Sequence, residues 1–276
     1  MIGSTLFRFF LLQESFDVYG LVRSKVIGEN LKLSKNILIS GDLTNTNTLA
    51  DLIKEYTPSV IINCAGITKH LKECKNNAKA IQINSLLPHE IVNICRNLNT
   101  KIIQISTDCI FSGSKGNYKE QDIPDSIDIY GKSKYLGEIS DKPHLTIRTS
   151  TIGHEINTKH GLLEWFLVQN KCMGYKNAIF SGITTLELAK VIYKILRYYE
   201  NLNGIYHISS EPIDKYSLLK MISVTYKHNV ELAPNLDFRI DRSLNSTRFS
   251  LATDYISPQW EEMISSMYKF QKKTNV

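Results

Sequence analysis

Three side chains between residues 105 and 138 have the types and spacing needed to reduce a carbonyl group. Thr107 follows the β-branched run 101–105, which predicts a buried strand. Tyr130 and Lys134 stand four residues apart in a predicted helix, so both side chains lie on one helix face. An ammonium beside a phenol lowers the phenol's pKa from its usual value of about 10. Such a tyrosine can give a proton to a carbonyl oxygen while a hydride reaches the carbon.

Thr107 stands at the carboxyl end of its strand, where open α/β sheets place their ligands. There its hydroxyl can donate a second hydrogen bond to the same oxygen. The segment 109–129, rich in Gly, Ser, Asp and Pro, predicts a loop before the helix. A Tyr-x-x-x-Lys spacing alone is typical of an ordinary helix turn, so the interpretation depends on the Ser-Thr-Asp sequence upstream.

The composition is that of an ordinary soluble protein. The chain has 276 residues, 42% of them hydrophobic and 22% charged, which allows one large domain or two modest ones. The net charge of +6 is scattered, which argues against nucleic acid and suits an anionic small molecule or simply a soluble surface. Five cysteines without a Cys-x-x-Cys pair indicate free thiols and no zinc site, and no other cluster predicts a catalytic metal. Without a transmembrane run or signal peptide, we expect a cytoplasmic protein and no membrane contact.

Strands alternate with helices as far as residue 150, which predicts an α/β fold with a doubly wound, Rossmann-like parallel sheet. Beyond the strand at 101–105, strands are expected at 17–22, 36–40, 59–65 and 144–150. From residue 151 the pattern loosens. We expect helices there at 161–168, 185–199, 216–226 and 260–269, extended pieces at 175–180 and 206–210, and a polar loop at 240–249. Residues 151–276 are therefore expected to form mainly a smaller, substrate-binding domain over the cleft of residues 1–150.

Longer motifs extend over most of the chain: 105–113, 118–120, 128–138, 63–66, Asn84, 148–150 and 204–210. Together they resemble the extended short-chain dehydrogenase/reductase superfamily, and within it the dTDP-4-dehydrorhamnose reductase family. The resemblance implies an NAD(P)-binding domain at residues 1–150. It also implies reduction of the 4-keto group of a nucleotide-activated 6-deoxy sugar by NADPH, with NADH left open, for surface polysaccharide such as O-antigen. Thr107 would orient the sugar carbonyl, Tyr130 would protonate it, and Lys134 would hold the nicotinamide ribose.

Further binding residues follow from this resemblance. In the family, an arginine after the second strand accommodates the 2′-phosphate of NADPH. Arg23 stands at this position, although it could also be a plain surface residue. The predicted cofactor-binding residues, besides Tyr130 and Lys134, are Gly3, Arg23, Asp42, Leu43, Cys64, Ala65 and Gly66. Thr107, Asp108, Arg148 and Arg242 are the predicted substrate-binding residues. Arg148 could equally be a buried ion-pair partner, and Arg242 could equally be plain surface.

The resemblance breaks at the amino terminus. Residues 1–10 predict a helix, and Gly3 matches the last glycine of the family's G-x-x-G-x-x-G turn. The central strand and the earlier glycines, which would cradle a pyrophosphate, are missing from this sequence. We expect a truncation, such as a start assigned at an internal methionine, rather than a true variant with crippled cofactor binding. On that view the chain as written should be less stable.

Three questions stay open at this level. Asp108 stands where dehydratases of the superfamily carry an acid-base carboxylate, so an epimerase or dehydratase remains an alternative. The missing glycine turn favours a non-catalytic, NADP-binding regulatory subunit, whereas the intact Tyr130 and Lys134 pair argues against it. The sequence does not decide whether the chain forms a homodimer.

Overall fold

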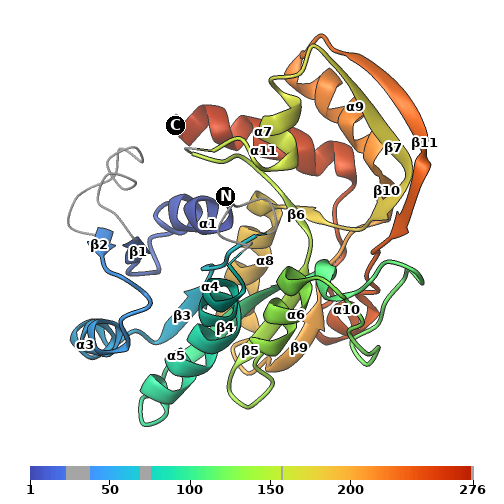
Figure 1. Ribbon diagram of the computed structural model, residues 1–276. Helices are drawn as coiled ribbons and strands as arrows, with labels where there is room; N and C mark the ends of the chain where they lie inside the picture. Colours follow the sequence, from blue (N-terminus) through green and yellow to red (C-terminus); the bar gives the residue numbers. More distant parts are fainter. Residues whose placement is uncertain (23–37, 69–75, 157, 275–276) are drawn as a thin grey trace.

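The computed structural model describes residues 1–22, 38–68, 76–156 and 158–274 (Figure 1). Arg23 lies outside these residues. The first half contains α1 (Ile2–Phe10), β1 (Gly20–Val22), β2 (Leu38–Ser40), α3 (Thr46–Tyr56), β3 (Val60–Asn63), α4 (Asn77–Ile81), η3 (Gln82–Leu86), α5 (Leu87–Cys95), β4 (Lys101–Thr107), η4 (Asp108–Ile110) and α6 (Ile129–Leu136). The second contains β5 (Leu145–Thr149), β6 (Thr151–Ile152), α7 (Leu162–Phe166), β7 (Lys171–Phe180), β8 (Ile183–Thr184), α8 (Thr185–Tyr198), β9 (Gly204–His207), β10 (Ile213–Asp214), α9 (Lys215–Tyr226), β11 (Glu231–Asp241), α10 (Thr247–Thr253) and α11 (Trp260–Thr274).

The main sheet is parallel and has the strand order β3-β4-β5-β9. Ile103 of β4 lies opposite Ile62 of β3 and Leu145 of β5. β1 and β2 pair in parallel as a separate two-stranded sheet. In the main sheet, α5 lies between β3 and β4 in the chain, α6 between β4 and β5, and α8 between β5 and β9. The predicted α/β class with a parallel sheet is therefore confirmed.

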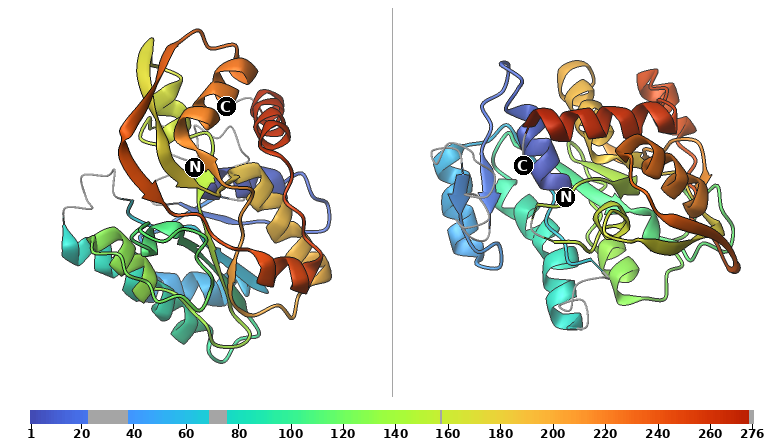
Figure 2. Two further views of the ribbon diagram at one scale, coloured as in Figure 1. Left: turned by 90° about the vertical axis from the view of Figure 1, so that its right-hand side faces the viewer. Right: turned by 90° about the horizontal axis from the view of Figure 1, so that it is seen from above.

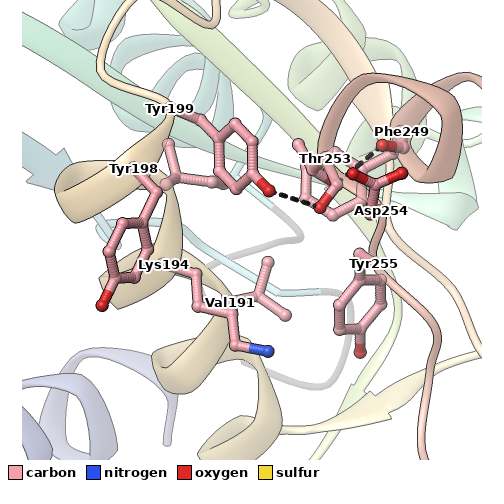
Figure 3. A pocket seen from close by; sticks show the side chains of 9 residues that line it. Val191, Lys194, Tyr198, Tyr199, Phe249, Thr253, Asp254 and Tyr255 are labelled. Atoms are coloured by element: carbon pink, nitrogen blue, oxygen red, sulfur yellow. Dashed lines mark hydrogen bonds between the residues drawn. The ribbon is translucent and has the colours of Figure 1, made fainter.

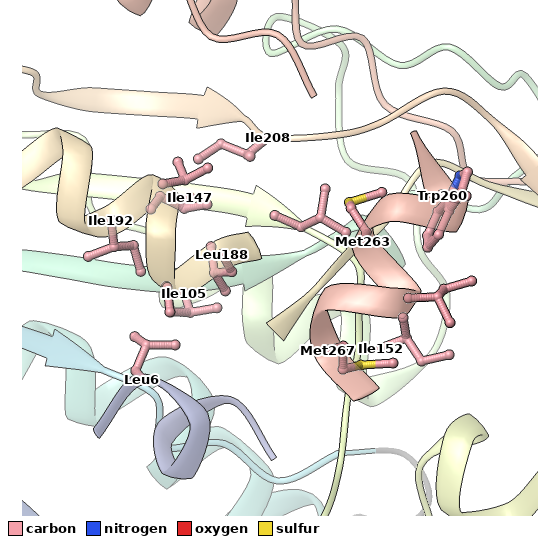
Figure 4. Packing of buried hydrophobic residues seen from close by; sticks show 14 of the residues in the cluster. Leu6, Ile105, Ile147, Ile152, Leu188, Ile192, Ile208, Trp260, Met263 and Met267 are labelled. Carbon is pink, nitrogen blue, oxygen red and sulfur yellow. The ribbon is translucent and has the colours of Figure 1, made fainter. Parts of the chain in front are cut away.

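Helices cover both faces of this sheet. Successive side chains of a strand point to opposite sides, so neighbouring residues of β4 pack against different helices. Ile105 of β4 packs with Leu6 of α1 and with Leu188 and Ile192 of α8 (Figure 4). Ile102, on the opposite face, packs in a second cluster with residues of α3 and α5. The near-continuous apolar run of β4 follows from this burial on both faces.

A smaller three-stranded sheet, in the order β10-β7-β11, is drawn at the upper right of Figure 1 with α9 beside it. β7 and β11 pair in parallel, and their register shifts between Asn235 and Arg239. In the left view of Figure 2, the smaller sheet is drawn in the upper part of the molecule and the main sheet in the lower part. β11 was not predicted as a strand, and the expected polar loop at 240–249 contains its end and the start of α10.

The second half of the chain also contributes to the main sheet. β9 pairs with β5, and α8 packs against α1 within the larger hydrophobic core. Residues 151–276 therefore form the smaller sheet and also add β9 to the main sheet and α8 to its core. The expected division at residue 150 stays a prediction.

Candidate active site

The end of β4 places Thr107 and Asp108 at the carboxyl edge of the main sheet. The Thr107 hydroxyl donates a hydrogen bond to Asp108 Oδ1 at 3.1 Å and accepts one from the backbone N–H of Cys109. The short η4 turn begins at Asp108, so the chain leaves the sheet immediately after Thr107. Both side chains are buried against the protein but line a large cavity.

Helix α6 brings Tyr130 and Lys134 to the same edge. Asp128 caps the helix by accepting a hydrogen bond from the N–H of Gly131 at 2.7 Å. A Cβ at Gly131 would lie 2.3 Å from the carbonyl oxygen of Cys109. Only glycine therefore lets α6 approach the turn after β4 so closely. Tyr130 shares a hydrogen bond with Thr107.

Lys134 follows Tyr130 by four residues on α6 and is almost fully buried. Its Nζ donates a hydrogen bond to the carbonyl oxygen of Ile105 at 2.5 Å. Burial lowers the pKa of Lys134 to about 8, while the negative charge of Glu138 and the thiol of Cys64 act to raise it. The ammonium thus loses solvation that its neighbours only partly replace.

The pKa of Tyr130 differs from the expectation. Burial raises it above its usual value, Cys109 and Asp108 add to the increase, and the hydrogen bond with Thr107 acts against it. A buried phenolate loses its hydration, and nearby acidic groups repel its charge. The predicted lowering of this pKa by Lys134 is therefore not found in the structure.

One cavity of about 560 Å³ joins the candidate site to the smaller sheet. Thr107, Asp108 and Tyr130 line it at the end of the main sheet. Arg242, which follows β11, lines it as well, and its Nε donates a hydrogen bond to the carbonyl oxygen of Phe111 at 2.9 Å. The structure thus brings Arg242 to the same cavity as the catalytic candidates.

The opposite wall of this cavity contains side chains that the sequence did not single out. Tyr175 of β7 and Phe238 of β11 form a tilted ring pair with centroids 5.3 Å apart. The ammonium of Lys215 lies 3.3 Å from the centroid of the Phe180 ring. Trp165 of α7 also lines the cavity. A prediction that β7 pairs with β11 would have brought Tyr175 and Phe238 together, but β11 was not predicted as a strand.

Four of the predicted cofactor residues lie at the start of α1 and just after β3: Gly3, Cys64, Ala65 and Gly66. A Cβ at Gly3 would lie 3.3 Å from Cys64 Cβ, so α1 begins beside the end of β3. Burial raises the pKa of the Cys64 thiol to about 12. The N–H of Ala65 donates to Asn63 Oδ1, and Gly66 is exposed next to Asn84.

Asp42 and Leu43 follow β2. Asp42 Oδ1 accepts hydrogen bonds from the backbone and hydroxyl of Thr44, and Leu43 packs against the cluster that contains α3. Neither lines the large cavity, which reaches this half of the chain at Ile2 and Thr68. The large cavity therefore reaches the start of α1 and the segment after β3, but not Asp42 and Leu43.

Arg148 lies away from the cavity. Its guanidinium forms an ion pair with Glu138, with Nη2 to Oε2 at 2.7 Å and both side chains 3% exposed. This is the second of the two roles that the sequence left open. Asn84, in the π-helical turn η3, holds Ile67 and Ser133 by hydrogen bonds.

A second cavity of about 250 Å³ lies between the end of α8 and the end of α10 (Figure 3). Lys194 and Tyr198 stand on one side of it, and Asp254 and Tyr255 on the other. None of the predicted site residues lines it.

None of the helices in residues 1–22, 38–68, 76–156 and 158–274 has the length and apolar character to cross a membrane. The His, Cys, Asp and Glu side chains of these residues form no group of three or more that could hold a metal ion.

A family model described as "RmlD substrate binding domain" matches residues 1–269. The chain belongs to this family. The match confirms the resemblance that the motifs indicated.

Individual relatives agree with this assignment. The dTDP-4-dehydrorhamnose reductase of Aggregatibacter actinomycetemcomitans is 30% identical over 183 residues, 62% of each protein. A solved structure of a hypothetical dTDP-4-dehydrorhamnose reductase from Sulfolobus tokodaii covers 94% of both chains, with 30% identity and a TM-score of 0.77. The dTDP-4-dehydrorhamnose reductase of Bacillus anthracis in complex with NADP covers 88% of this chain and 95% of that one, with 23% identity and a TM-score of 0.74.

Similarity to a different kind of protein also exists. Methionine adenosyltransferase 2 subunit beta of Bos taurus is 29% identical over 97 residues, 35% of this chain and 29% of that protein. The first curated relatives are matched over 33% to 66% of their own length.

Proposed function

We propose that this protein uses NADPH to reduce the 4-keto group of a nucleotide-activated 6-deoxy sugar. The observation that carries the proposal is the meeting of Thr107 and Tyr130 at one end of a large cavity, with Lys134 of the same helix bonded to the strand that ends at Thr107. The family and its reductase relatives support the same reaction class.

The proposed reaction divides simply between cofactor and protein. NADPH supplies a hydride to the carbonyl carbon. The Thr107 hydroxyl orients the sugar oxygen, and the Tyr130 hydroxyl gives it a proton. Because the pKa of Tyr130 is raised in the structure, the phenol is fully protonated near neutral pH and ready to donate. Lys134 holds the ribose next to the nicotinamide and favours the phenolate that remains after proton transfer.

The rest of the substrate has matching partners along the cavity. Arg242 and Lys215 would bind the diphosphate, since cations form strong hydrogen bonds with phosphate oxygens. Tyr175 and Phe238, exposed by 42% and 47%, would stack on the nucleobase. A cavity of about 560 Å³ suits a ligand of this size.

The test is NADPH consumption with dTDP- and UDP-linked 4-keto-6-deoxy sugars, followed by the fall of NADPH absorbance. We expect stoichiometric oxidation of NADPH, a slower rate with NADH, and a loss of at least about a hundredfold in kcat for Tyr130→Phe. Tyr135→Phe, one turn further along α6 and 44% exposed, is the matched control and should keep full activity. Absence of turnover with either sugar would contradict the reductase assignment.

A second candidate is a non-catalytic subunit that binds NADP and regulates an enzyme. The similarity to methionine adenosyltransferase 2 subunit beta favours it. Binding of NADPH without oxidation, together with stable capture of a partner enzyme, would move this candidate to the front. Recycling of the cofactor without net consumption would instead indicate an epimerase or dehydratase, in which Asp108 would serve as the acid-base group.

A further inference from the structure

A buried carboxylate lies directly beneath the candidate site. Glu138 Oε1 accepts hydrogen bonds from Ser106 Oγ at 2.6 Å and from Arg148 Nε at 2.9 Å, and its Oε2 accepts one from Arg148 Nη2 at 2.7 Å. With three donors and 3% exposure, this carboxylate is fixed in position beside its guanidinium.

The Glu138 carboxylate and the Lys134 ammonium are held by consecutive residues of β4. Lys134 Nζ donates to the carbonyl oxygen of Ile105, and Ser106 Oγ donates to Glu138. Glu138 stands just beyond the end of α6, four residues after Lys134, with its backbone N–H bonded to the Tyr135 carbonyl. The turn after the helix therefore brings the Glu138 carboxylate to the residue of β4 that follows the one bonded by Lys134.

Other charged and titratable groups around this pair are few. Cys64 at the end of β3 also favours the charged form of Lys134. Tyr130, Asp108 and Cys109 line the cavity, where Cys109 and Asp108 raise the pKa of Tyr130. Beyond Glu138 lie Arg148, His207 and Glu120, which are linked to one another by hydrogen bonds. Among the described residues, Glu138 is the carboxylate that stabilises the buried ammonium most.

We propose that Glu138, held by Arg148, is a positioning residue that keeps the buried Lys134 ammonium charged beside the end of β4. Lys134 needs this counter-ion because its own surroundings disfavour an ammonium. The consequence for catalysis rests on the proposed reductase function, in which the positive charge of Lys134 favours the phenolate of Tyr130. The statement about the charge of Lys134 can be tested without any substrate.

The first measurement is a pH titration of the lysine side chains by NMR in protein labelled with ¹³C-lysine. The Lys134 signal is assigned by its loss in Lys134→Arg. In Glu138→Gln we expect the Lys134 pKa to fall by about one unit or more relative to the unmodified chain. Glu120→Gln makes the same chemical change in the same hydrogen-bond network but does not face Lys134, so its Lys134 pKa should stay unchanged. An unchanged Lys134 pKa in Glu138→Gln, or an equal fall in Glu120→Gln, would overturn the proposal.

Removing one partner of a buried ion pair can prevent folding. If Glu138→Gln does not fold, Glu138→Gln combined with Arg148→Gln removes both charges of the ion pair and is titrated in its place. Its Lys134 pKa should also fall, but by less, because the Arg148 cation that repels the ammonium is lost as well. In active protein, the alkaline limb of the kcat/KM profile should move to lower pH by the same amount. If no variant and no parent protein turns over, the reductase assignment fails, while the NMR titration still decides the role of Glu138.

Discussion

At the scale of single residues, the cavity separates chemistry from binding. Thr107 and Tyr130 lie at one end, and Lys215 and Arg242 lie along the wall next to the smaller sheet. Side chains that grip a diphosphate contribute equally to binding of substrate and transition state, so their loss should raise KM more than it lowers kcat.

We therefore expect Arg242→Met and Lys215→Met each to raise the KM for the nucleotide sugar by about tenfold or more, because each removes a charged donor. The KM for NADPH should stay unchanged. Lys176→Met is the matched control: Lys176 lies on β7, above the ring of Tyr216, and does not line the cavity. Steady-state kinetics with each substrate varied in turn measure both constants. A kcat that falls while the KM for sugar stays the same would contradict the assigned roles.

The sequence predicted the catalytic candidates because Thr107, Tyr130 and Lys134 belong to one strand, one loop and one helix. Their meeting needs only local folding. Tyr175 and Phe238 meet only because β7 pairs with β11, which are separated by α8 and α9. The raised pKa of Tyr130 also escaped prediction, since burial is a property of the folded chain.

At the scale of elements, most helices and strands of the main sheet were predicted within a few residues. Their hydrophobic patterns are strong because they are buried on one or both sides. β11 was missed because its residues are mostly exposed, and because Pro234 argues against a strand. It lies at an edge of the smaller sheet, where a strand needs little hydrophobic pattern.

The contact between α6 and η3 gives a prediction about stability. A Cβ at Gly137 would lie 1.9 Å from the backbone oxygen of Asn84, which cannot move without disturbing the π-helical turn. Gly137→Ala should therefore lower the free energy of unfolding by about 2 to 3 kcal/mol and Tm by about 5 to 10 °C. At Gly161 the nearest atom is the flexible side chain of Glu155 at 3.3 Å, so Gly161→Ala should change Tm much less. Thermal unfolding followed by circular dichroism compares the two, and equal Tm values would show that the two helices can separate easily.

At the scale of the whole molecule, His207 joins distant parts of the chain. It ends β9, accepts a contact from Arg148 of β5 at 3.4 Å, and faces the carbonyl oxygen of Tyr118 at 3.0 Å. Its backbone N–H donates to Glu120. Burial, together with the charge of Arg148, lowers the pKa of His207 to about 3 from an ordinary value of 6.5. His207 is therefore neutral in the folded protein throughout the physiological range.

This lowered pKa makes stability depend on pH. The unfolded chain binds a proton at His207 below pH 6.5, whereas the folded chain does not until about pH 3. Its contribution is complete above pH 6.5 and is lost as the pH falls from 6.5 towards 3, by at most about 1.4 kcal/mol per pH unit. Denaturant unfolding between pH 7.5 and about 4.5 should therefore show falling stability, and His207→Gln should flatten the curve.

The window above pH 4.5 matters because the carboxylates with lowered pKa values, such as Asp122, Asp125 and Glu155, lose their contribution only at lower pH. His144, whose pKa is also lowered by burial, remains in both proteins and cancels in the difference. His207→Gln will be less stable than the parent at pH 7.5, because it alters buried hydrogen bonds, so the slope and not the absolute value is the test. Parallel curves for the two proteins would mean that His207 is not held neutral, and that the link between β9, β5 and the loop of Tyr118 is looser than the hydrogen bonds indicate.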